Sequence, residues 1–381
     1  MTAYPKKDLY NKYLQEQASE AFHYECINEE SYKNILEKHT HELYTPNYFI
    51  RVGLALLSIV AVVLSLALFW LITSADSETA VTMLMIFFAI ICYGFLELMV
   101  KQKKYYNAGI DNILLVMILV FIVSAMFFNE SNNSHEISVF IALLICTWLA
   151  IRFVDACMAV LAFASLIWFF FLVYTRLGTF GKMTASFALM LLCAAVFIAA
   201  RNFIKKHNNV IYKNCLQWII LIALLCFYAA GNYFVVNELS LEMFNAPIAL
   251  GFIFWILTFV VPLFYIIYGL IKRENIFYRT GIVLLIISVL TVRYYHAVMP
   301  AEIAMTVFGS VIIILSFALI KYLKQPVKGY TFENIDHTDK NILNAEAVII
   351  AQVFGKKVMP QSDHFKFGGG SSGGAGATGN Y

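Results

Sequence analysis

Charged residues are scarce in this chain. Asp, Glu, Lys and Arg make up 13% of the 381 residues, against about 25% in an ordinary soluble domain. Apolar residues reach 61%, with 33 Phe and 22 Tyr. In water this much apolar surface would leave large exposed patches, whereas a lipid bilayer solvates it. The composition therefore indicates an integral membrane protein, and a net charge of only +3 argues against a nucleic-acid partner.

The sequence also has little that could hold a metal or a cofactor. Its seven cysteines show no CxxC spacing and lie mostly in apolar runs, which is typical of buried thiols. None of the eight histidines falls in the middle of a predicted span, which excludes a haem held by two histidines inside the bundle. Walker, GxSxG and HExxH motifs are missing, as are acidic runs within the spans. We therefore predict no metal and no cofactor, and these absences argue against a membrane protease, haem oxidase or ATPase.

What the sequence does contain is a series of long apolar runs. A helix needs about 20 apolar residues to cross ~30 Å of hydrocarbon, and helices satisfy their own backbone groups in lipid whereas isolated strands do not. The boundary between the fourth and fifth runs is marked only by Arg152–Asp155. The runs predict an all-α, polytopic transmembrane bundle of about ten spans, near 49–73, 79–100, 110–128, 136–154, 156–175, 183–200, 214–236, 249–271, 276–297 and 302–321.

The cations between the runs predict an orientation, because Lys and Arg accumulate in cytoplasmic loops. Alternate loops and the two outer flanks carry seventeen cations, and the opposite loops carry three, namely Arg176, Lys182 and Arg293. The asymmetry predicts that the amino and carboxyl termini are both cytoplasmic. The seventeen are Lys33, Lys38, Arg51, Lys101, Lys103, Lys104, Arg152, Arg201, Lys205, Lys206, Lys213, Lys272, Arg273, Arg279, Lys321, Lys324 and Lys328.

Polar segments flank the predicted transmembrane domain, residues 49–321. Residues 1–48 show no apolar signal-peptide core. Their apolar positions recur at helical spacing on either side of a break near Asn28, which predicts a helical hairpin with Asn28 as the N-cap of its second helix. Residues 322–381 predict a tail with one short apolar helix, 341–354, and a disordered glycine-rich end. The hairpin or the tail could bind a protein partner, although docking of the hairpin on its own membrane domain is the favoured interpretation.

Ionisable residues within or beside the spans are costly in lipid and are therefore candidates for function. The most suggestive set lies at the outer ends of the ninth and tenth spans, where Arg293, His296 and Glu302 could bind an anionic headgroup or substrate. Asn232 and Tyr233 end the seventh span on the same side and could join them. An ordinary interfacial anchor is the alternative interpretation.

Other polar positions favour a structural role. Glu97 and Lys101 lie at i,i+4 spacing, which predicts an ion pair, and Arg152 and Asp155, three residues apart, could neutralise each other. Pro262, in the middle of the eighth span, removes a backbone donor and predicts a kink that could line a cavity.

Three stretches of sequence carry a resemblance to a known family. They are CINEESYKNILEKH in the hairpin, PNYFIRVGLALLSIVAVVLSLALFWLI in the first span, and NAEAVIIAQVFG followed by FKFGGGSSGGAGATGNY in the tail. In this order of parts the chain resembles uncharacterised polytopic membrane proteins of Bacteroidetes-type bacteria. The resemblance implies a bacterial inner (cytoplasmic) membrane and supplies no catalytic residue.

Three functions fit the sequence. The leading hypothesis is transport or flux of a small molecule or lipid, because a many-span bundle without large soluble domains has few other ways to act. The alternatives are a non-catalytic membrane scaffold or envelope-assembly factor, acting through the hairpin and the tail, and a lipid- or glycan-modifying enzyme that uses Arg293, His296 and Glu302. The sequence leaves the oligomeric state open.

Overall fold

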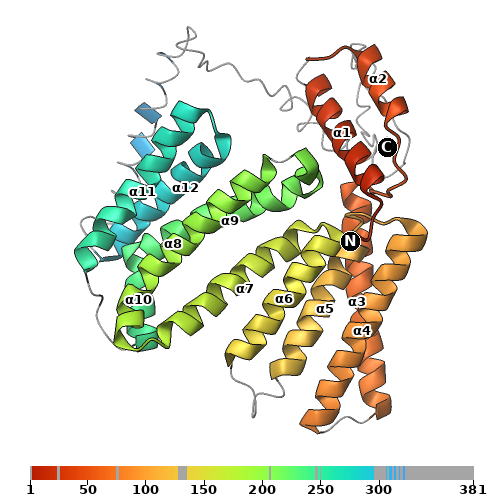
Figure 1. The fold of residues 1–381 in the computed structure, drawn as a ribbon, viewed down its shortest axis with the longest axis horizontal. Coiled ribbons are helices and arrows are strands. Elements are labelled where there is room, and N and C mark those ends of the chain that lie inside the picture. Colours follow the sequence, from red (N-terminus) through yellow and green to blue (C-terminus); the bar gives the residue numbers. More distant parts are fainter. Residues whose placement is uncertain are drawn as a thin grey trace, which may run out of the picture. The chain divides into compact units, whose positions relative to one another are not determined.

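The computed structural model describes residues 2–23, 26–73, 77–127, 135–205, 207–244, 248, 250–295 and seven positions between 306 and 321. Over these residues the chain is all-helical, as predicted, with no β-strand (Figure 1). The helices are α1 (Lys6–His23), α2 (Glu29–Lys38), α3 (Tyr48–Thr73), α4 (Glu78–Lys103), α5 (Ile110–Phe127), α6 (His135–Phe153), α7 (Ala156–Thr175), α8 (Thr179–Ile204), the 3-10 helix η1 (His207–Tyr212), α9 (Lys213–Gly231), α10 (Tyr233–Phe244), α11 (Gly251–Lys272) and α12 (Asn275–Tyr295).

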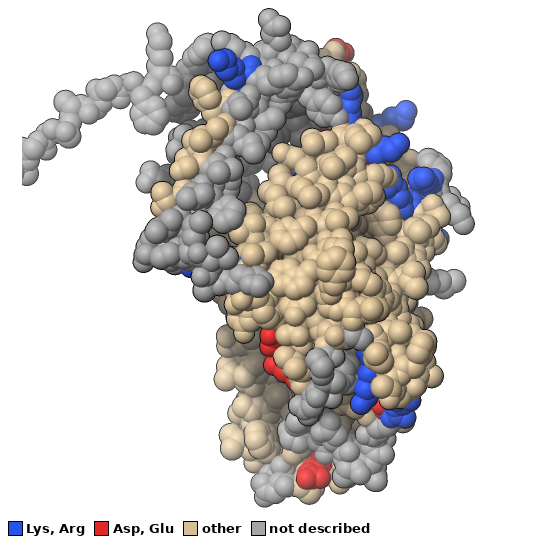
Figure 2. All heavy atoms as spheres, turned by 90° about the vertical axis from the view of Figure 1, so that its left-hand side faces the viewer, with Lys and Arg blue, Asp and Glu red and all other residues tan. Residues whose placement is uncertain are grey.

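Eight of these helices are long and apolar enough to cross a membrane: α3, α4, α6, α7, α8, α9 with the end of η1, α11 and α12. They are compatible with a multi-pass membrane protein. Figure 2 shows a broad surface without charged side chains between charged groups at its upper and lower ends. The predicted third span is α5, a shorter apolar helix, and most of the predicted tenth span lies outside the described residues. The total of ten spans therefore stays a prediction.

The predicted seventh span, 214–236, differs from the structure. Helix α9 ends at Gly231, Asn232 is extended, and α10 then covers most of the segment between the predicted seventh and eighth spans. Hydropathy cannot detect this break, because the apolar residues continue past Asn232. The predicted fourth and fifth spans are separate helices, α6 and α7.

Consecutive helices pack as pairs, with the most extensive contacts in α4–α5, α6–α7, α8–α9 and α11–α12. One apolar core joins α4, α5, α6 and α7, and a second joins α8, α9, α11 and α12. The α11–α12 pair approaches closely at two glycines. A Cβ on Gly269 would lie 2.6 Å from the Tyr278 backbone nitrogen, and one on Gly281 would lie 2.9 Å from the Ile266 nitrogen. Small residues at such crossings let helix backbones touch in lipid.

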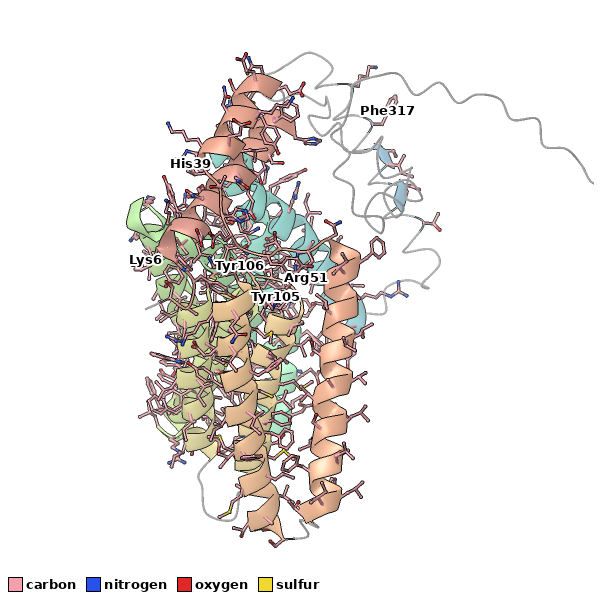
Figure 3. The ribbon with its side chains drawn as sticks, turned by 90° about the vertical axis from the view of Figure 1, so that its right-hand side faces the viewer. Lys6, His39, Arg51, Tyr105, Tyr106 and Phe317 are labelled. Carbon is pink, nitrogen blue, oxygen red and sulfur yellow. The ribbon has the colours of Figure 1, made fainter. Side chains whose placement is uncertain are left out.

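The amino-terminal hairpin docks on the membrane domain of its own chain. Asn28 caps α2 by accepting from the Ser31 N–H at 2.9 Å, as predicted. Tyr4, Leu9 and Leu43 are buried in the core of α4, α5, α6 and α7. Hydrogen bonds to backbone carbonyls fix this docking. The Ala3 N–H donates to the Arg152 carbonyl at 2.7 Å, the Tyr4 side-chain hydroxyl donates to the Tyr105 carbonyl at 2.8 Å, and a backbone bridge pairs Tyr44 with Tyr105. Figure 3 shows Tyr105, Tyr106 and Arg51 together beneath the hairpin.

Candidate functional site

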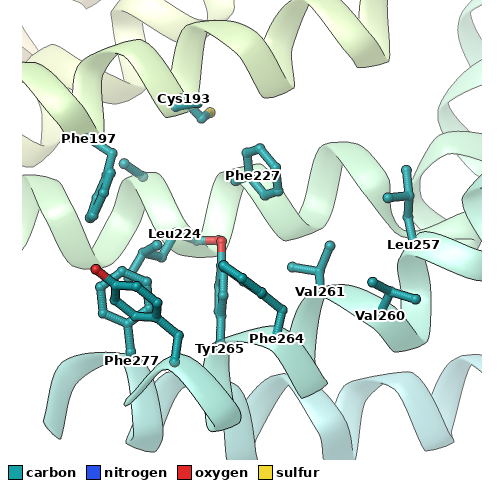
Figure 4. A pocket seen from close by; sticks show the side chains of 13 residues that line it. Cys193, Phe197, Leu224, Phe227, Leu257, Val260, Val261, Phe264, Tyr265 and Phe277 are labelled. Atoms are coloured by element: carbon teal, nitrogen blue, oxygen red, sulfur yellow. The ribbon is translucent and has the colours of Figure 1, made fainter. Parts of the chain in front are cut away.

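An apolar pocket of about 410 Å³ lies between α8, α9, α11 and α12 (Figure 4). Aromatic side chains supply much of its wall, and almost no polar atom faces it. We call it the apolar pocket. It is lined by Cys193, Ala194, Phe197, Ala223, Leu224, Phe227, Leu257, Val260, Val261, Phe264, Tyr265, Tyr268 and Phe277.

The apolar pocket opens sideways along α11. Its lining residues Val260 and Phe264 are 52% and 56% exposed, whereas Val261 and Tyr265, on the inner face of the same helix, are buried. Because α11 is one of the helices of membrane-spanning length, this opening faces hydrocarbon when the helix spans a bilayer. The occupant that matches such a pocket is the apolar chain of a lipid or of another amphiphile.

A polar group contacts two of the residues that line the apolar pocket. Arg201, on α8, forms an ion pair with Glu274 in the turn between α11 and α12, and its guanidinium donates to Tyr268 Oη at 3.3 Å. Tyr268 and Phe197 line the apolar pocket, and the Arg201 guanidinium lies 6.0 Å from the centre of the Phe197 ring. A guanidinium binds carboxylate and phosphate oxygens through two parallel hydrogen bonds. An anion-binding group therefore lies next to two residues of the apolar lining.

Pro262 lies beside the apolar pocket. The carbonyl that this proline leaves without a helical donor is satisfied by a neighbouring helix. In an α-helix the N–H of residue 262 would donate to the carbonyl of Thr258, and proline has no N–H. The Ser288 hydroxyl on α12 donates to this carbonyl at 2.7 Å. Helix α11 runs through Pro262 from Gly251 to Lys272 without interruption. The Thr258 carbonyl of α11 therefore depends on α12 for its hydrogen bond.

Ser288 belongs to a buried hydrogen-bond network that joins α9 to α12. The Asn232 amide donates to Tyr228 Oη at 2.8 Å and to Thr291 Oγ1 at 3.2 Å. Tyr228 Oη and Ser288 Oγ are 2.9 Å apart. Because Ser288 donates to the Thr258 carbonyl, it accepts from Tyr228 Oη, which in turn accepts from the Asn232 amide. Asn232 is only 1% exposed, and every polar group in this series has a partner.

The break between α9 and α10 depends on the same helices. The Tyr233 N–H, which the break leaves without a helical partner, donates to Thr258 Oγ1 at 3.0 Å. The Asn232 side-chain oxygen accepts from the Val235 N–H at 3.3 Å and so caps α10. Where a helix breaks inside a membrane domain, the freed backbone groups need hydrogen-bond partners within the protein. Thr258 therefore serves both the helix break, with its hydroxyl, and the proline site, with its carbonyl.

The predicted outer cluster is described only in part. Arg293 lies in the last turn of α12, but His296 and Glu302 lie outside the described residues. Arg293 forms no ion pair with any residue that the structure describes. The rings of Tyr233 and Tyr295 meet at 5.1 Å, so Tyr233 reaches the same end of α12, whereas Asn232 points into the buried network. The cluster itself stays a prediction.

The candidate ion pairs form a different pattern from the expected one. Glu97 pairs with Lys101 at 3.6 Å, as the spacing predicts, and more closely with Arg152, whose Nη2 lies 2.5 Å from Glu97 Oε1. Tyr93 Oη donates to the same oxygen at 3.2 Å. The expected partner of Arg152 was Asp155, and that expectation was wrong. The reason is that α4 packs near α6 in space, which places a carboxylate from another helix beside Arg152.

Asp155 instead caps α7, where its carboxylate accepts from the Met158 N–H at 2.8 Å. This carboxyl is buried, and burial raises its pKa; the nearby charge of Asp111 raises it further, while the Met158 hydrogen bond acts in the opposite direction. Asp155 is therefore a structural cap that carries an electrostatic cost.

The sequence predicts only part of this site. In the sequence Arg201 is one of seventeen cations on the predicted cytoplasmic side, and no local pattern points to Glu274 or to the pocket aromatics. A usable signal was the Thr258–Pro262 spacing, since a proline always frees the carbonyl four residues before it. Nothing local in the sequence identifies Ser288 as the donor for that carbonyl. Within the described residues, no group of three or more His, Cys, Asp or Glu side chains is placed to hold a metal ion.

No protein family, curated protein or solved structure matches this chain. The resemblance to Bacteroidetes-type membrane proteins therefore stays a prediction.

Proposed function

We propose that this protein carries lipid across or within the membrane, with the apolar chain of the lipid in the apolar pocket. The observation that supports this best is the lateral opening of the pocket at Val260 and Phe264, beside a helix that contains Pro262. A chain can enter from the bilayer without crossing water. A water-soluble substrate would have no polar partners inside the pocket, so the geometry favours a lipid over a small polar molecule.

Arg201 supplies the headgroup end of the proposed path. Its ion pair with Glu274 is partly exposed, and a lipid phosphate or carboxylate can replace Glu274 as the partner of the guanidinium. When the lipid anion replaces Glu274, Arg201 keeps an anionic partner. This limits the free-energy cost of burying a cation in the membrane. Tyr268 adds a hydroxyl beside the same position.

Helix α11 is the element proposed to move. At Pro262 it lacks one internal hydrogen bond, and the substitute bond comes from Ser288 on α12. A displacement of α11 relative to α12 therefore breaks a bond between helices and leaves the α11 ladder otherwise intact. We further propose that the protein lies in a bacterial inner membrane, with its cation-rich end facing the cytoplasm.

A flux assay with a pocket-filling variant tests this function. Proteoliposomes would contain a phospholipid with a nitrobenzoxadiazole-labelled acyl chain, and dithionite added outside would reduce the label and bleach the outer leaflet. The wild-type chain is expected to expose the inner-leaflet lipid to bleaching. Ala194→Phe fills the apolar pocket and is expected to reduce that rate at least about tenfold, as for a lost binding energy of about 1.4 kcal/mol.

The matched control is Ala195→Phe, because Ala195 neighbours Ala194 on α8 but is exposed and does not line the pocket. Equal rates for wild type, Ala194→Phe and empty liposomes would refute lipid flux through this pocket.

The other two hypotheses gain less support. The hairpin expected to bind a partner already buries Tyr4, Leu9 and Leu43 against its own membrane domain. Two of the three residues expected to act in an enzyme, His296 and Glu302, lie outside the described residues. Loss of a pulled-down partner on deletion of residues 367–381 would support the scaffold hypothesis.

A further inference from the structure

A second, polar cavity lies where the hairpin meets the membrane domain. It measures about 640 Å³ and is lined by residues of α1, the start of α3, the α4–α5 loop, η1 and the first turns of α9. We call it the polar cavity. Its size falls within the range of about 300–1,000 Å³ that is typical of small-molecule sites. It shares no lining residue with the apolar pocket.

Three cations from three different helices line the polar cavity: Lys12, Arg51 and Lys213. Two carboxylates, Glu16 and Glu20, also line it, both on exposed positions of α1. Lys12 is paired with Glu16 at 2.8 Å. The charge of that cation is therefore already compensated.

Arg51 and Lys213 have no such compensation. Among the described residues neither forms an ion pair with a carboxylate. Arg51 donates to the Asn107 amide oxygen at 3.4 Å, and Lys213 Nζ donates to Tyr13 Oη at 3.1 Å. Asp155 acts on Arg51 only from beyond ion-pair distance. The polar cavity thus contains two cations whose direct partners are neutral.

The walls of the polar cavity hold these cations in place. A Cβ on Gly109 would lie 2.2 Å from the Arg51 carbonyl oxygen, so the α4–α5 loop packs directly on the first turn of α3. Lys213 is the first residue of α9, where the helix dipole adds positive potential. Lys213 also lies 5.2 Å from the centre of the Tyr13 ring, which fixes it against α1. The site is therefore assembled before any ligand binds.

We infer that the polar cavity binds the phosphate group of a phosphomonoester. Such a group carries a charge of about −1.5 to −2 near pH 7. It can pair with the two cations that have no carboxylate partner, and the three cations and two carboxylates of the lining together carry a net charge of +1. Its oxygens suit the fork of the Arg51 guanidinium and the ammonium of Lys213. The cavity is larger than one phosphate, and side-chain amides and hydroxyls line the remaining space, so the ligand carries an organic, hydrogen-bonding body.

Binding of AMP to the purified full-length chain in phosphatidylcholine nanodiscs tests this site. Equilibrium dialysis with labelled AMP is expected to show saturable binding, with inorganic phosphate as a weaker competitor and adenosine as none. A parallel arm adds phosphatidic acid, a phosphomonoester lipid, to the nanodiscs. Loss of AMP binding in that arm would identify a lipid headgroup as a source of the phosphate, and unchanged binding would identify a water-soluble ligand.

Charge-removing variants locate the binding. Lys213→Gln is expected to weaken AMP binding about tenfold, as for one lost charged hydrogen bond, and Lys213→Arg is expected to restore most of it. The control is Lys103→Gln, which removes the same charge at an exposed position at the end of α4, outside the polar cavity. Melting temperatures of all variants would verify that each one folds.

Two results would overturn the inference. One is the absence of AMP and phosphatidic acid binding by the folded wild-type chain. The other is equal weakening by Lys213→Gln and Lys103→Gln, because a general surface potential would then explain the binding. Neither result bears on lipid flux through the apolar pocket, so the two proposals fail separately.

Discussion

The Ser288 hydroxyl donates a 2.7 Å hydrogen bond to the Thr258 carbonyl, the acceptor that Pro262 leaves without its helical donor. The two residues lie on neighbouring helices, thirty positions apart in the sequence. This bond links the proline of α11 to the buried network around Asn232 and to the break between α9 and α10. It also gives the region a stability test that does not depend on transport.

Replacement of Ser288 by Ala is expected to destabilise the protein by about 1–3 kcal/mol, because the Thr258 carbonyl and Tyr228 Oη both lose a buried partner. In a Pro262→Ala background the N–H of residue 262 satisfies Thr258 again. The cost of Ser288→Ala should therefore be smaller there. Denaturant unfolding in detergent would measure this double-mutant cycle, and strictly additive effects would contradict the proposed compensation.

The ion pair between Glu97 and Arg152 gives a second prediction. Both side chains are mostly buried, at 13% and 22% exposed. Glu97→Gln removes one partner and leaves a shielded guanidinium, so a loss of about 3 kcal/mol is expected. The double variant with Arg152→Met should recover part of that loss. Lys101→Gln, whose side chain is 69% exposed, should cost less than about 1 kcal/mol and serves as the control.

Asp155 predicts a pH dependence of stability. Burial raises its pKa above the unfolded value of about 3.9, so the folded state binds this proton more tightly than the unfolded state. Its contribution to stability is present below pH ~4 and falls as the pH rises through the folded pKa. Asp155→Asn keeps the α7 cap and should remove this fall. Asp155→Ala also loses the cap, so it should be about 1 kcal/mol less stable than Asp155→Asn at every pH. Melting curves between pH 4 and 8 would check both variants.

Gly109→Ala is expected to be disruptive. Gly109 has φ +97°, and an added Cβ would lie 2.2 Å from the Arg51 carbonyl oxygen. The unfavourable φ and the clash with backbone together predict a loss of about 1–3 kcal/mol. Gly53→Ala, in the first turns of α3 with open space around it, should be neutral or stabilising. A similar melting temperature for the two variants would show that the loop does not pack on α3.

The orientation can be tested by labelling single cysteines in a cysteine-free background. Ser77, in the short loop before α4, belongs to the cation-poor end, and Lys103 belongs to the cation-rich end. A membrane-impermeant maleimide should label Ser77→Cys in intact cells and Lys103→Cys only after permeabilisation. The reverse pattern would place the cation-rich end outside.

Much of the fold follows from local properties of the sequence. The apolar runs predict the helices α3, α4, α6, α7, α8, α11 and α12 because helix length in lipid is set by the thickness of the bilayer. Asn28 predicts the start of α2, because the capping side chain and the N–H that it accepts from are three residues apart. The break at Asn232 was missed, because it is stabilised by Thr258 on another helix and leaves hydropathy unchanged.

The candidate site was less predictable. The sequence points to Pro262 through the loss of one backbone donor, but the pocket beside it requires the side chains of four helices. Arg152 was paired with its neighbour in sequence, whereas the structure pairs it with Glu97, 55 residues away. Short sequence separation predicts contact only within one helix, and packing between helices decides the rest.

The sequence by itself determined that this chain is helical, apolar enough for multiple membrane spans, and markedly asymmetric in its cations. These properties depend on composition and periodicity along the chain. Only the tertiary structure decided which carbonyl Ser288 satisfies, which carboxylate Arg152 meets, and that Arg51 and Lys213 face one cavity. The physical reason is that hydrogen bonds and ion pairs act over a few ångströms, and only helix packing brings distant residues within that range.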